Sequence, residues 1–341
     1  MKRFIKISLV TVLCLVALIA MGVTATIGWR PIIGPRARPL TDRAFERTPE
    51  RLARGKYIVE SEAACADCHS THDWSKRNAP ILPGMEGAGR DFSELKGLPG
   101  AVMAPNLTPD PETGTGTWSD DALGRAIREG IGHDGRALFP MMPYQNYRRM
   151  PDEDLASVIV FLRSLPPVRN PLPKTEIIFP AKYLMRSAPE PLTSPVPPPD
   201  LSDQVKRGEF ILNIAGCRDC HTPMDRGEFL PNMDMGGGQI FEGPWGRVAS
   251  ANLTPDPSGI PYYDESLFLQ AMRTGYVRAR SLNQIMPWRH YGGMTDEDLK
   301  AIFAYLKTLK PIHHVVDNEE PPTMCVLCNA LHGGGDKNKK N

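Results

Sequence analysis

Cys65–His69 reads C-A-D-C-H, and Cys217–His221 repeats this pattern as C-R-D-C-H. The sequence after each pentad repeats in the same order. The stretch N-L-T-P-D occurs at Asn106–Asp110 and again at Asn252–Asp256, and each copy is followed later by a Met-Pro pair with an aromatic residue after it. Landmarks that recur at nearly constant spacing predict one structural module used twice.

The pentads determine the chemistry of the chain. C-x-x-C-H is the attachment signature of c-type haem: both cysteines form thioethers with one porphyrin, and the next histidine binds the iron. A zinc half-site or a thiol redox pair also uses C-x-x-C, but the repetition of the surrounding sequence argues against both. We therefore predict two covalently bound haems. The attachment residues are Cys65, Cys68, Cys217 and Cys220, and the proximal iron ligands are His69 and His221.

Each module is predicted to be helical. Apolar residues recur at helical spacing in three segments of each module, which are 51–64, 120–129 and 152–165 in the first and 204–215, 265–273 and 296–309 in the second. Connections rich in glycine and proline separate these segments. No run of alternating β-branched residues is present, so few strands are expected.

With these motifs in this order, the chain resembles class I cytochrome c over roughly residues 50–170 and 204–312. The resemblance implies an all-α fold with two tandem modules. It also implies that the first and last helices of a module cross near the haem, where a small residue meets an aromatic one. The matching pairs are Gly55 with Phe161 and Gly208 with Tyr305.

The resemblance further implies a methionine as the distal iron ligand. Met142 and Met286 fit, because each precedes a proline shortly before the last helix of its module. Methionine ligation raises the reduction potential of a haem. Met141 is a neighbouring alternative, although alignment of the two Met-Pro pairs favours Met142. The rival ligands are His72, His133 and His290, which we interpret as ordinary polar histidines.

The N-terminal segment predicts export. Basic residues at the start precede an apolar run, Ile7–Trp29, that is long enough to span a bilayer, for which about 20 residues suffice. The basic residues should stay in the cytoplasm and send the rest of the chain into the periplasm. We favour a retained inner-membrane anchor, and cleavage after Val23-Thr-Ala25 is the alternative.

The predicted layout has five parts. These are an anchor or signal segment (1–30), a first cytochrome c domain (50–168), a Pro-rich linker (169–203), a second cytochrome c domain (204–312) and a C-terminal tail (313–341). The apolar stretch Ile177–Leu184 in the linker is expected to pack along a module. The net charge of +1, from 40 basic and 39 acidic residues, gives no reason to expect a nucleic-acid partner.

The tail contains a second kind of cysteine pair, Cys325 and Cys328, followed by His332. Because no histidine directly follows Cys328, a third haem of the same type is not expected. A disulfide suits an oxidising compartment. A small metal site is a second interpretation and would need a fourth ligand from elsewhere. Free thiols and an unusual cofactor attachment complete the open alternatives.

The motifs resemble most closely the dihaem and multihaem cytochrome subunits of periplasmic alcohol and sugar dehydrogenases. This resemblance implies an electron carrier of the respiratory chain without catalytic activity of its own. Electrons would pass from a dehydrogenase or a quinol to a downstream cytochrome or oxidase. The alternatives are a dihaem peroxidase-type enzyme, which needs an open iron, and a haem-bearing subunit of a respiratory complex. The parallel Met-Pro loops argue against the peroxidase.

Overall fold

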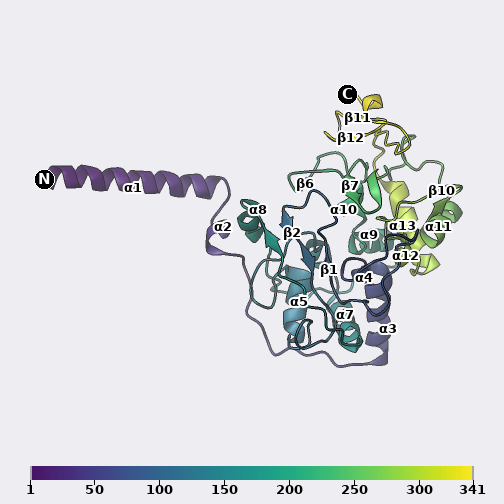
Figure 1. Cartoon of the computed structure of the whole chain (residues 1–341), viewed down its shortest axis with the longest axis horizontal. Helices are drawn as coiled ribbons and strands as arrows, with labels where there is room; N and C mark the ends of the chain where they lie inside the picture. Colours follow the sequence, from purple (N-terminus) through teal and green to yellow (C-terminus); the bar gives the residue numbers. More distant parts are fainter. Residues whose placement is uncertain (1, 340–341) are drawn as a thin grey trace.

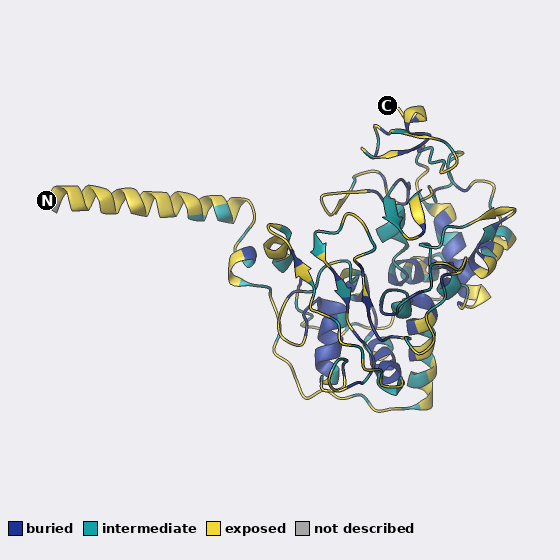
Figure 2. Ribbon diagram, viewed as in Figure 1, coloured by how far each residue is buried: buried dark blue, intermediate teal, exposed yellow. Residues whose placement is uncertain are grey.

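The computed structural model describes residues 2–339 (Figure 1). The helix α1 (Lys2–Ala25) extends away from a rounded body that contains the rest of the chain. Its segment Arg3–Ala25 is long and apolar enough to cross a membrane, and none of it is buried in the protein (Figure 2). Signal sequences have the same properties, so both predictions for the N-terminal segment remain open.

The six helices predicted from apolar spacing are all present. They are α3 (Pro49–Tyr57), α5 (Asp120–Glu129) and α7 (Asp152–Ser164), followed by α9 (Gln204–Ile214), α11 (Glu265–Thr274) and α13 (Asp296–Thr308). A π-helical turn, η1 (Ile58–Glu62), extends α3 toward the first pentad. Side-chain caps define several starts: Thr48 accepts a hydrogen bond from Arg51 N, and Ser119 accepts one from Ala122 N.

Short helices complete the helical set. They are α2 (Arg30–Ile33), α4 (Cys65–Cys68), α6 (Tyr144–Tyr147), α8 (Ala181–Leu184), α10 (Cys217–His221) and α12 (Trp288–Tyr291), with 3-10 turns η2 (Met185–Ser187) and η3 (Gly335–Lys337). Helices of all kinds make up 37% of the chain.

The expected all-α fold needs correction, because the described residues also form twelve short strands. These pair as six antiparallel hairpins or bridges: β1 (Arg90–Asp91) with β3 (Met103–Ala104), β2 (Gly100–Ala101) with β4 (Glu176–Ile177), β5 (Met224–Asp225) with β6 (Glu228–Phe229), β7 (Ile240–Gly243) with β8 (Gly246–Ala249), β9 (Tyr276–Val277) with β10 (Arg280–Ser281), and β11 (Pro322–Met324) with β12 (Leu331–Gly333). Strands of two to four residues are too short to produce an alternating sequence pattern, which explains why the sequence did not indicate them.

Close approach of helix backbones organises each half of the body. A Cβ atom placed on Gly55 in α3 would lie 1.9 Å from the Ser157 carbonyl oxygen and 2.9 Å from Phe161 Cβ, both in α7. The predicted contact of Gly55 with Phe161 is therefore confirmed. A Cβ on Gly208 in α9 would lie 1.9 Å from the Ala301 carbonyl oxygen in α13.

The second predicted pair differs in its contacts. The atoms nearest to the Cβ position of Gly208 belong to Ala301 and Ile302, whereas Tyr305 lies one helical turn further along α13. There the Tyr305 hydroxyl accepts a hydrogen bond of 2.5 Å from Arg218 Nη2. Tyr305 therefore connects α13 to the helix that carries the second pentad.

Replacing Gly55 with alanine is expected to lower the free energy of unfolding by about 1–3 kcal/mol or more, since overpacking usually costs this much. The added methyl group cannot coexist with a carbonyl oxygen at 1.9 Å, so α3 and α7 must separate. Chemical denaturation checks this prediction. Lys56→Ala, on the exposed side of the same turn, should change stability by less than about 0.5 kcal/mol. Equal effects of the two substitutions would contradict the close approach.

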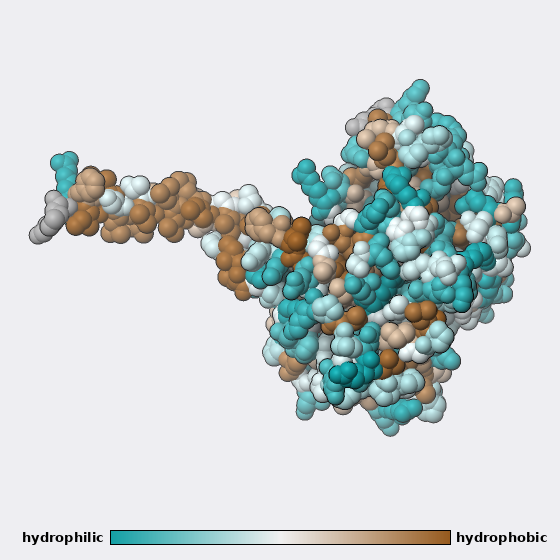
Figure 3. Space-filling model, in the orientation of Figure 1, coloured by the Kyte–Doolittle hydropathy of each residue, from teal (hydrophilic) through white to brown (hydrophobic). Residues whose placement is uncertain are grey.

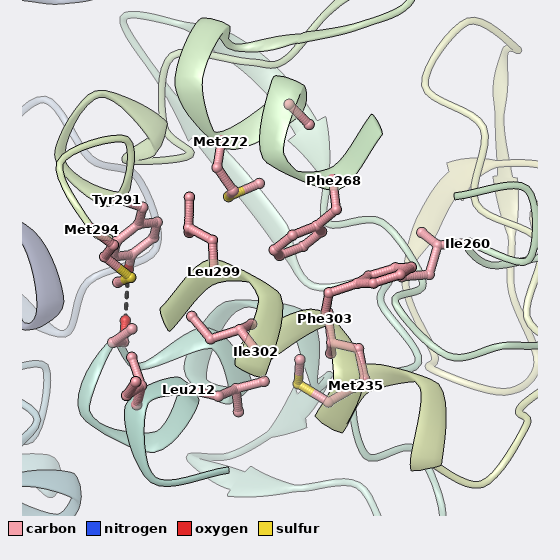
Figure 4. Packing of buried hydrophobic residues seen from close by; sticks show 14 of the residues in the cluster. Leu212, Met235, Ile260, Phe268, Met272, Tyr291, Met294, Leu299, Ile302 and Phe303 are labelled. Carbon is pink, nitrogen blue, oxygen red and sulfur yellow. Dashed lines mark hydrogen bonds between the residues drawn. The ribbon is translucent and has the colours of Figure 1, made fainter. Parts of the chain in front are cut away.

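The two halves share their hydrophobic cores. Figure 4 shows the cluster among α9, α11 and α13, where Leu212, Phe268 and Phe303 pack together. Ala64 from the first half belongs to this cluster, and Ile214 from the second half belongs to the cluster beside α3 and α7. The halves are therefore packed together, and each completes part of the other's interior.

The Pro-rich segment between the halves follows the surface of the first half. Its strand β4 pairs with β2, so that Ile177 lies opposite Gly100 and is only 7% exposed. The predicted packing of the apolar stretch Ile177–Leu184 along a module is confirmed at Ile177, while Phe179 remains exposed.

Candidate functional site

Both pentads form short helices after a residue with left-handed backbone geometry. Ala64, with φ of 46°, precedes α4, and Gly216, with φ of 68°, precedes α10. The four cysteines of the two pentads are free and partly buried. Burial raises the pKa of the Cys65 and Cys68 thiols to about 12. In each pair the two thiols lie one helical turn apart, a spacing that suits two thioethers to one porphyrin.

The two pentad histidines each contact a backbone carbonyl group through the same ring nitrogen. His69 Nδ1 lies 2.7 Å from the Pro105 carbonyl oxygen, and His221 Nδ1 lies 2.8 Å from the Ala251 carbonyl oxygen. Burial lowers the pKa of both histidines, so the imidazoles are neutral and Nδ1–H donates to the carbonyl. This arrangement leaves Nε2 as the nitrogen available to a metal, with the ring orientation fixed.

The repeated N-L-T-P-D stretch holds those carbonyl groups in place. The side-chain oxygen of Asn106 accepts hydrogen bonds from the backbone and hydroxyl of Thr108 at 2.9 and 2.7 Å, while Nδ2 donates to the Val168 carbonyl oxygen at 2.7 Å. Asn252 makes the equivalent bonds with Thr254 and Ile312. Each asparagine directly follows the residue whose carbonyl group contacts the histidine, so the stretch positions the pentad histidine. The repeat identified this stretch, but the sequence alone did not assign its role.

The Met-Pro loops lie beside the pentads. Met142 is partly buried against the cluster that contains Cys65, and Met286 against the cluster that contains Cys217. Met141 packs into a third cluster, which contains Cys68. Because both neighbouring methionines approach the first pentad, the choice of Met142 as iron ligand stays a prediction.

A tyrosine five residues after each of these methionines fastens its loop to the pentad. The Tyr147 hydroxyl donates to the Ala63 carbonyl oxygen at 3.2 Å, and the Tyr291 hydroxyl donates to the Ala215 carbonyl oxygen at 2.6 Å (Figure 4). Ala63 and Ala215 each lie two residues before the first cysteine of a pentad. The methionine loop and the attachment helix are thus connected in the same way in both halves.

The rival histidines have other partners. His72 Nδ1 and Nε2 lie 2.8 and 2.9 Å from the carbonyl oxygens of Ala79 and Asp67. The His133 ring packs on Trp118, with ring centroids 4.1 Å apart. His290 Nδ1 lies 3.1 Å from the Glu60 carbonyl oxygen. Both ring nitrogens of His72 thus have protein partners, which favours its interpretation as a non-ligand. The same interpretation of His133 and His290 stays a prediction, since the buried Nε2 of His290 has no hydrogen-bond partner.

The aspartate of each pentad contacts the methionine loop of the other half. Asp67 forms an ion pair with Arg289, three residues after Met286. Asp219 accepts a hydrogen bond of 2.7 Å from Asn146 Nδ2, four residues after Met142. This exchange brings the two attachment helices to one shared interface between the halves.

The C-terminal tail is an ordered lobe around β11 and β12 (Figure 1), and residues 340 and 341 lie outside the described part of the chain. Cys325, Cys328 and His332 come together there with His314, which the sequence pattern did not indicate. Both cysteines are free.

Comparison with known proteins finds one family model and several relatives that resemble this chain. Residues 52–166 match the family model described as cytochrome c. The chain is 30% identical over 311 residues to a subunit of the nicotinate dehydrogenase of Pseudomonas putida, covering 85% of this chain and 24% of that protein. It is 27% identical over 294 residues to the cytochrome c subunit of the alcohol dehydrogenase (quinone) of Gluconacetobacter polyoxogenes, covering 80% and 60% of the two chains.

A third relative is shorter. The diheme cytochrome c-type protein of Cereibacter sphaeroides is 28% identical over 278 residues, which is 76% of this chain and 86% of that protein. In contrast, the chain spans between about a quarter and three fifths of the length of the two dehydrogenase subunits.

Proposed function

We propose, from the match of residues 52–166 to the cytochrome c family model, that the whole chain is a dihaem electron carrier built from two tandem cytochrome c modules. The modules would occupy residues 50–168 and 204–312, joined by the linker at 169–203. The protein would act as the electron-transfer subunit of a dehydrogenase complex, in keeping with the names of its relatives.

The observation that carries this proposal is the duplicated geometry of the proximal histidines. His69 and His221 use the same ring nitrogen and the same type of backbone acceptor. Each acceptor lies in a loop of its own that an asparagine anchors in the same way. Such a fixed ring with a free Nε2 fits a metal ligand. It appears once beside each cysteine pair, so the chain fits two haems.

When bound, haem supplies the iron that cycles between its ferric and ferrous states. Cys65 and Cys68 would hold one porphyrin, and Cys217 and Cys220 the other. His69 and His221 would be the proximal ligands, with Met142 and Met286 as distal ligands. The protein then sets the potential through these ligands and fixes the distance between the two sites through the contacts of Asp67 and Asp219.

We further propose that α1 is retained as an inner-membrane anchor and that the body faces the periplasm. The start of the body is fixed to the linker, since Arg186 Nη1 donates to the Pro31 carbonyl oxygen at 3.1 Å. Two segments meet at this contact: α2, and the part of the linker that leads into α8. Both carry exposed apolar side chains, among them Ile33 in α2 and Phe179 in the linker. The apolar surface of α1 continues onto α2 (Figure 3), which suits contact with a bilayer surface.

The partners follow from the same proposal. A dehydrogenase or a quinol would deliver electrons, and a downstream cytochrome or an oxidase would accept them. A near-neutral chain gives no reason for binding nucleic acid.

Carbon monoxide distinguishes a closed carrier from the peroxidase-type alternative. If methionine occupies the sixth position of both irons, the reduced protein should show almost no carbon monoxide binding on mixing, and the oxidised protein should show no peroxide turnover with a reducing dye. Met286→Ala opens one iron and serves as the positive control. Prompt binding of carbon monoxide by the unmodified protein would contradict the carrier and support a peroxidase-type enzyme.

A further inference from the structure

Four metal-binding side chains meet in the C-terminal lobe. The ligand atoms of His314, Cys325, Cys328 and His332 all lie within 4.8 Å of one another. His314 Nε2 is 3.3 Å from Cys325 Sγ, and Cys328 Sγ is 3.3 Å from His332 Nε2. These residues are between 0% and 6% exposed. The cluster is therefore a closed interior site, apart from both pentads.

The hairpin of β11 and β12 creates the cluster. Cys325 directly follows β11, and its backbone N–H donates to the Ala330 carbonyl oxygen at 2.9 Å. Asn329, with φ of 55°, turns the chain back so that His332 in β12 pairs with Thr323. A C-x-x-C turn followed by a histidine on the returning strand thus places three ligands on one side of the hairpin.

Hydrogen bonds orient the ligands toward one another. His314 Nδ1 lies 2.8 Å from the Gly236 carbonyl oxygen, and His332 Nδ1 lies 3.0 Å from that of Gly333. In both rings Nε2 is left facing a sulfur atom. Asn338 Nδ2 lies 3.4 Å from Cys325 Sγ, as a donor to a thiolate would. Outer contacts of this kind accompany metal ligands in proteins.

We propose that these four residues form a structural zinc site. Two thiolates and two imidazoles are a donor set typical of tetrahedral Zn²⁺, with bonds of about 2.3 Å to sulfur and 2.0–2.1 Å to nitrogen. A tetrahedron with those bonds has edges of roughly 3.3–3.8 Å. The two nitrogen–sulfur separations of 3.3 Å lie at the short end of this range. The remaining pairs, all within 4.8 Å, need to contract by at most about 1 Å around a single ion. Four buried protein ligands leave no open position, which indicates a structural rather than a catalytic role.

The lobe also braces the proximal side of the second pentad. The Gly236 carbonyl group accepts from His314, and the next residue, Gly237, donates its N–H to the His221 carbonyl oxygen at 2.7 Å. Asn318 exchanges hydrogen bonds of 2.8 and 2.9 Å with the backbone of Ala249, two residues before Ala251. This bracing of a haem ligand rests on the proposed function, whereas the zinc site does not.

Zinc content is the first test. The full-length haem protein is purified and washed with a chelator, and its metals are measured by inductively coupled plasma mass spectrometry. It should contain one zinc ion per chain. X-ray absorption at the zinc edge should show two sulfur and two nitrogen neighbours. The X-ray absorption measurement uses the unmodified protein, so its result does not depend on whether a variant folds. Absence of zinc together with either free thiols or a Cys325–Cys328 disulfide would overturn the site.

Variants test the bracing separately. Cys325→Ser with Cys328→Ser should abolish zinc binding and shift the potential of the second haem, while the first haem and the control Cys14→Ser keep their values. Loss of zinc with both potentials unchanged would refute the bracing and leave the zinc site standing. If no haem were present while zinc remained, the proposed function would fail and the zinc site would not.

Discussion

A chain with Cys217→Ser and Cys220→Ser is expected to hold one haem instead of two. Serine hydroxyls cannot replace thiols in the thioether bonds, and a porphyrin held only by His221 and Met286 would be lost during purification. The intact mass of the protein and the haem content per chain, from the pyridine haemochrome spectrum, measure this effect. The reciprocal variant, Cys65→Ser with Cys68→Ser, should lose the other haem.

The cysteine pair of the C-terminal lobe provides the matched control. Because Cys325 and Cys328 lie in a separate cluster, changing both to serine should leave two haems per chain. Retention of both haems after the change at Cys217 and Cys220 would contradict the assignment of the second pentad. Loss of a haem from the control, the chain with serine at Cys325 and Cys328, would contradict the same assignment.

Substituting the distal methionines is expected to produce the second large effect. Histidine in place of Met286 should lower the potential of one haem by an amount on the order of tenths of a volt, since axial ligands tune haem potentials over about 0.8 V. The cause is that nitrogen stabilises ferric iron more than the thioether does. Redox titration followed by absorption measures the shift, and Met142→His should shift the other haem.

Neighbouring methionines serve as controls. Met294 is 1% exposed within the hydrophobic cluster of the second half, so Met294→Leu should affect packing and leave both potentials nearly unchanged. Met141→Leu should do the same for the first haem. A large shift from Met141→Leu, with none from Met142→His, would assign the distal ligand to Met141.

Much of the architecture could be predicted from the sequence, because its main signals are local. Apolar spacing located six helices, since each buries one face against a core. The contact of Gly55 with Phe161 was predicted from the resemblance to class I cytochrome c, and the close approach of the two helix backbones there explains why that position is glycine. The twelve strands could not be predicted, since segments of two to four residues are too short to show an alternating pattern of apolar and polar residues.

The interactions that the sequence did not reveal are between distant residues. His314 precedes Cys325 by eleven residues and joins the cluster only because β11 and β12 fold back onto the loop at Gly236. The contacts of Asp67 with Arg289 and of Asp219 with Asn146 cross between the halves. Nothing local marks such pairs, and only packing of the two repeats against each other brings them together.

The most direct test of the central claim is electron paramagnetic resonance of the oxidised, unmodified protein at low temperature. Two closed irons, each held by one histidine and one methionine, predict two low-spin ferric signals of nearly equal intensity and the weak long-wavelength absorption that iron–methionine coordination produces. A high-spin ferric signal accounting for one of the haems would show an open iron and would contradict the dihaem electron carrier.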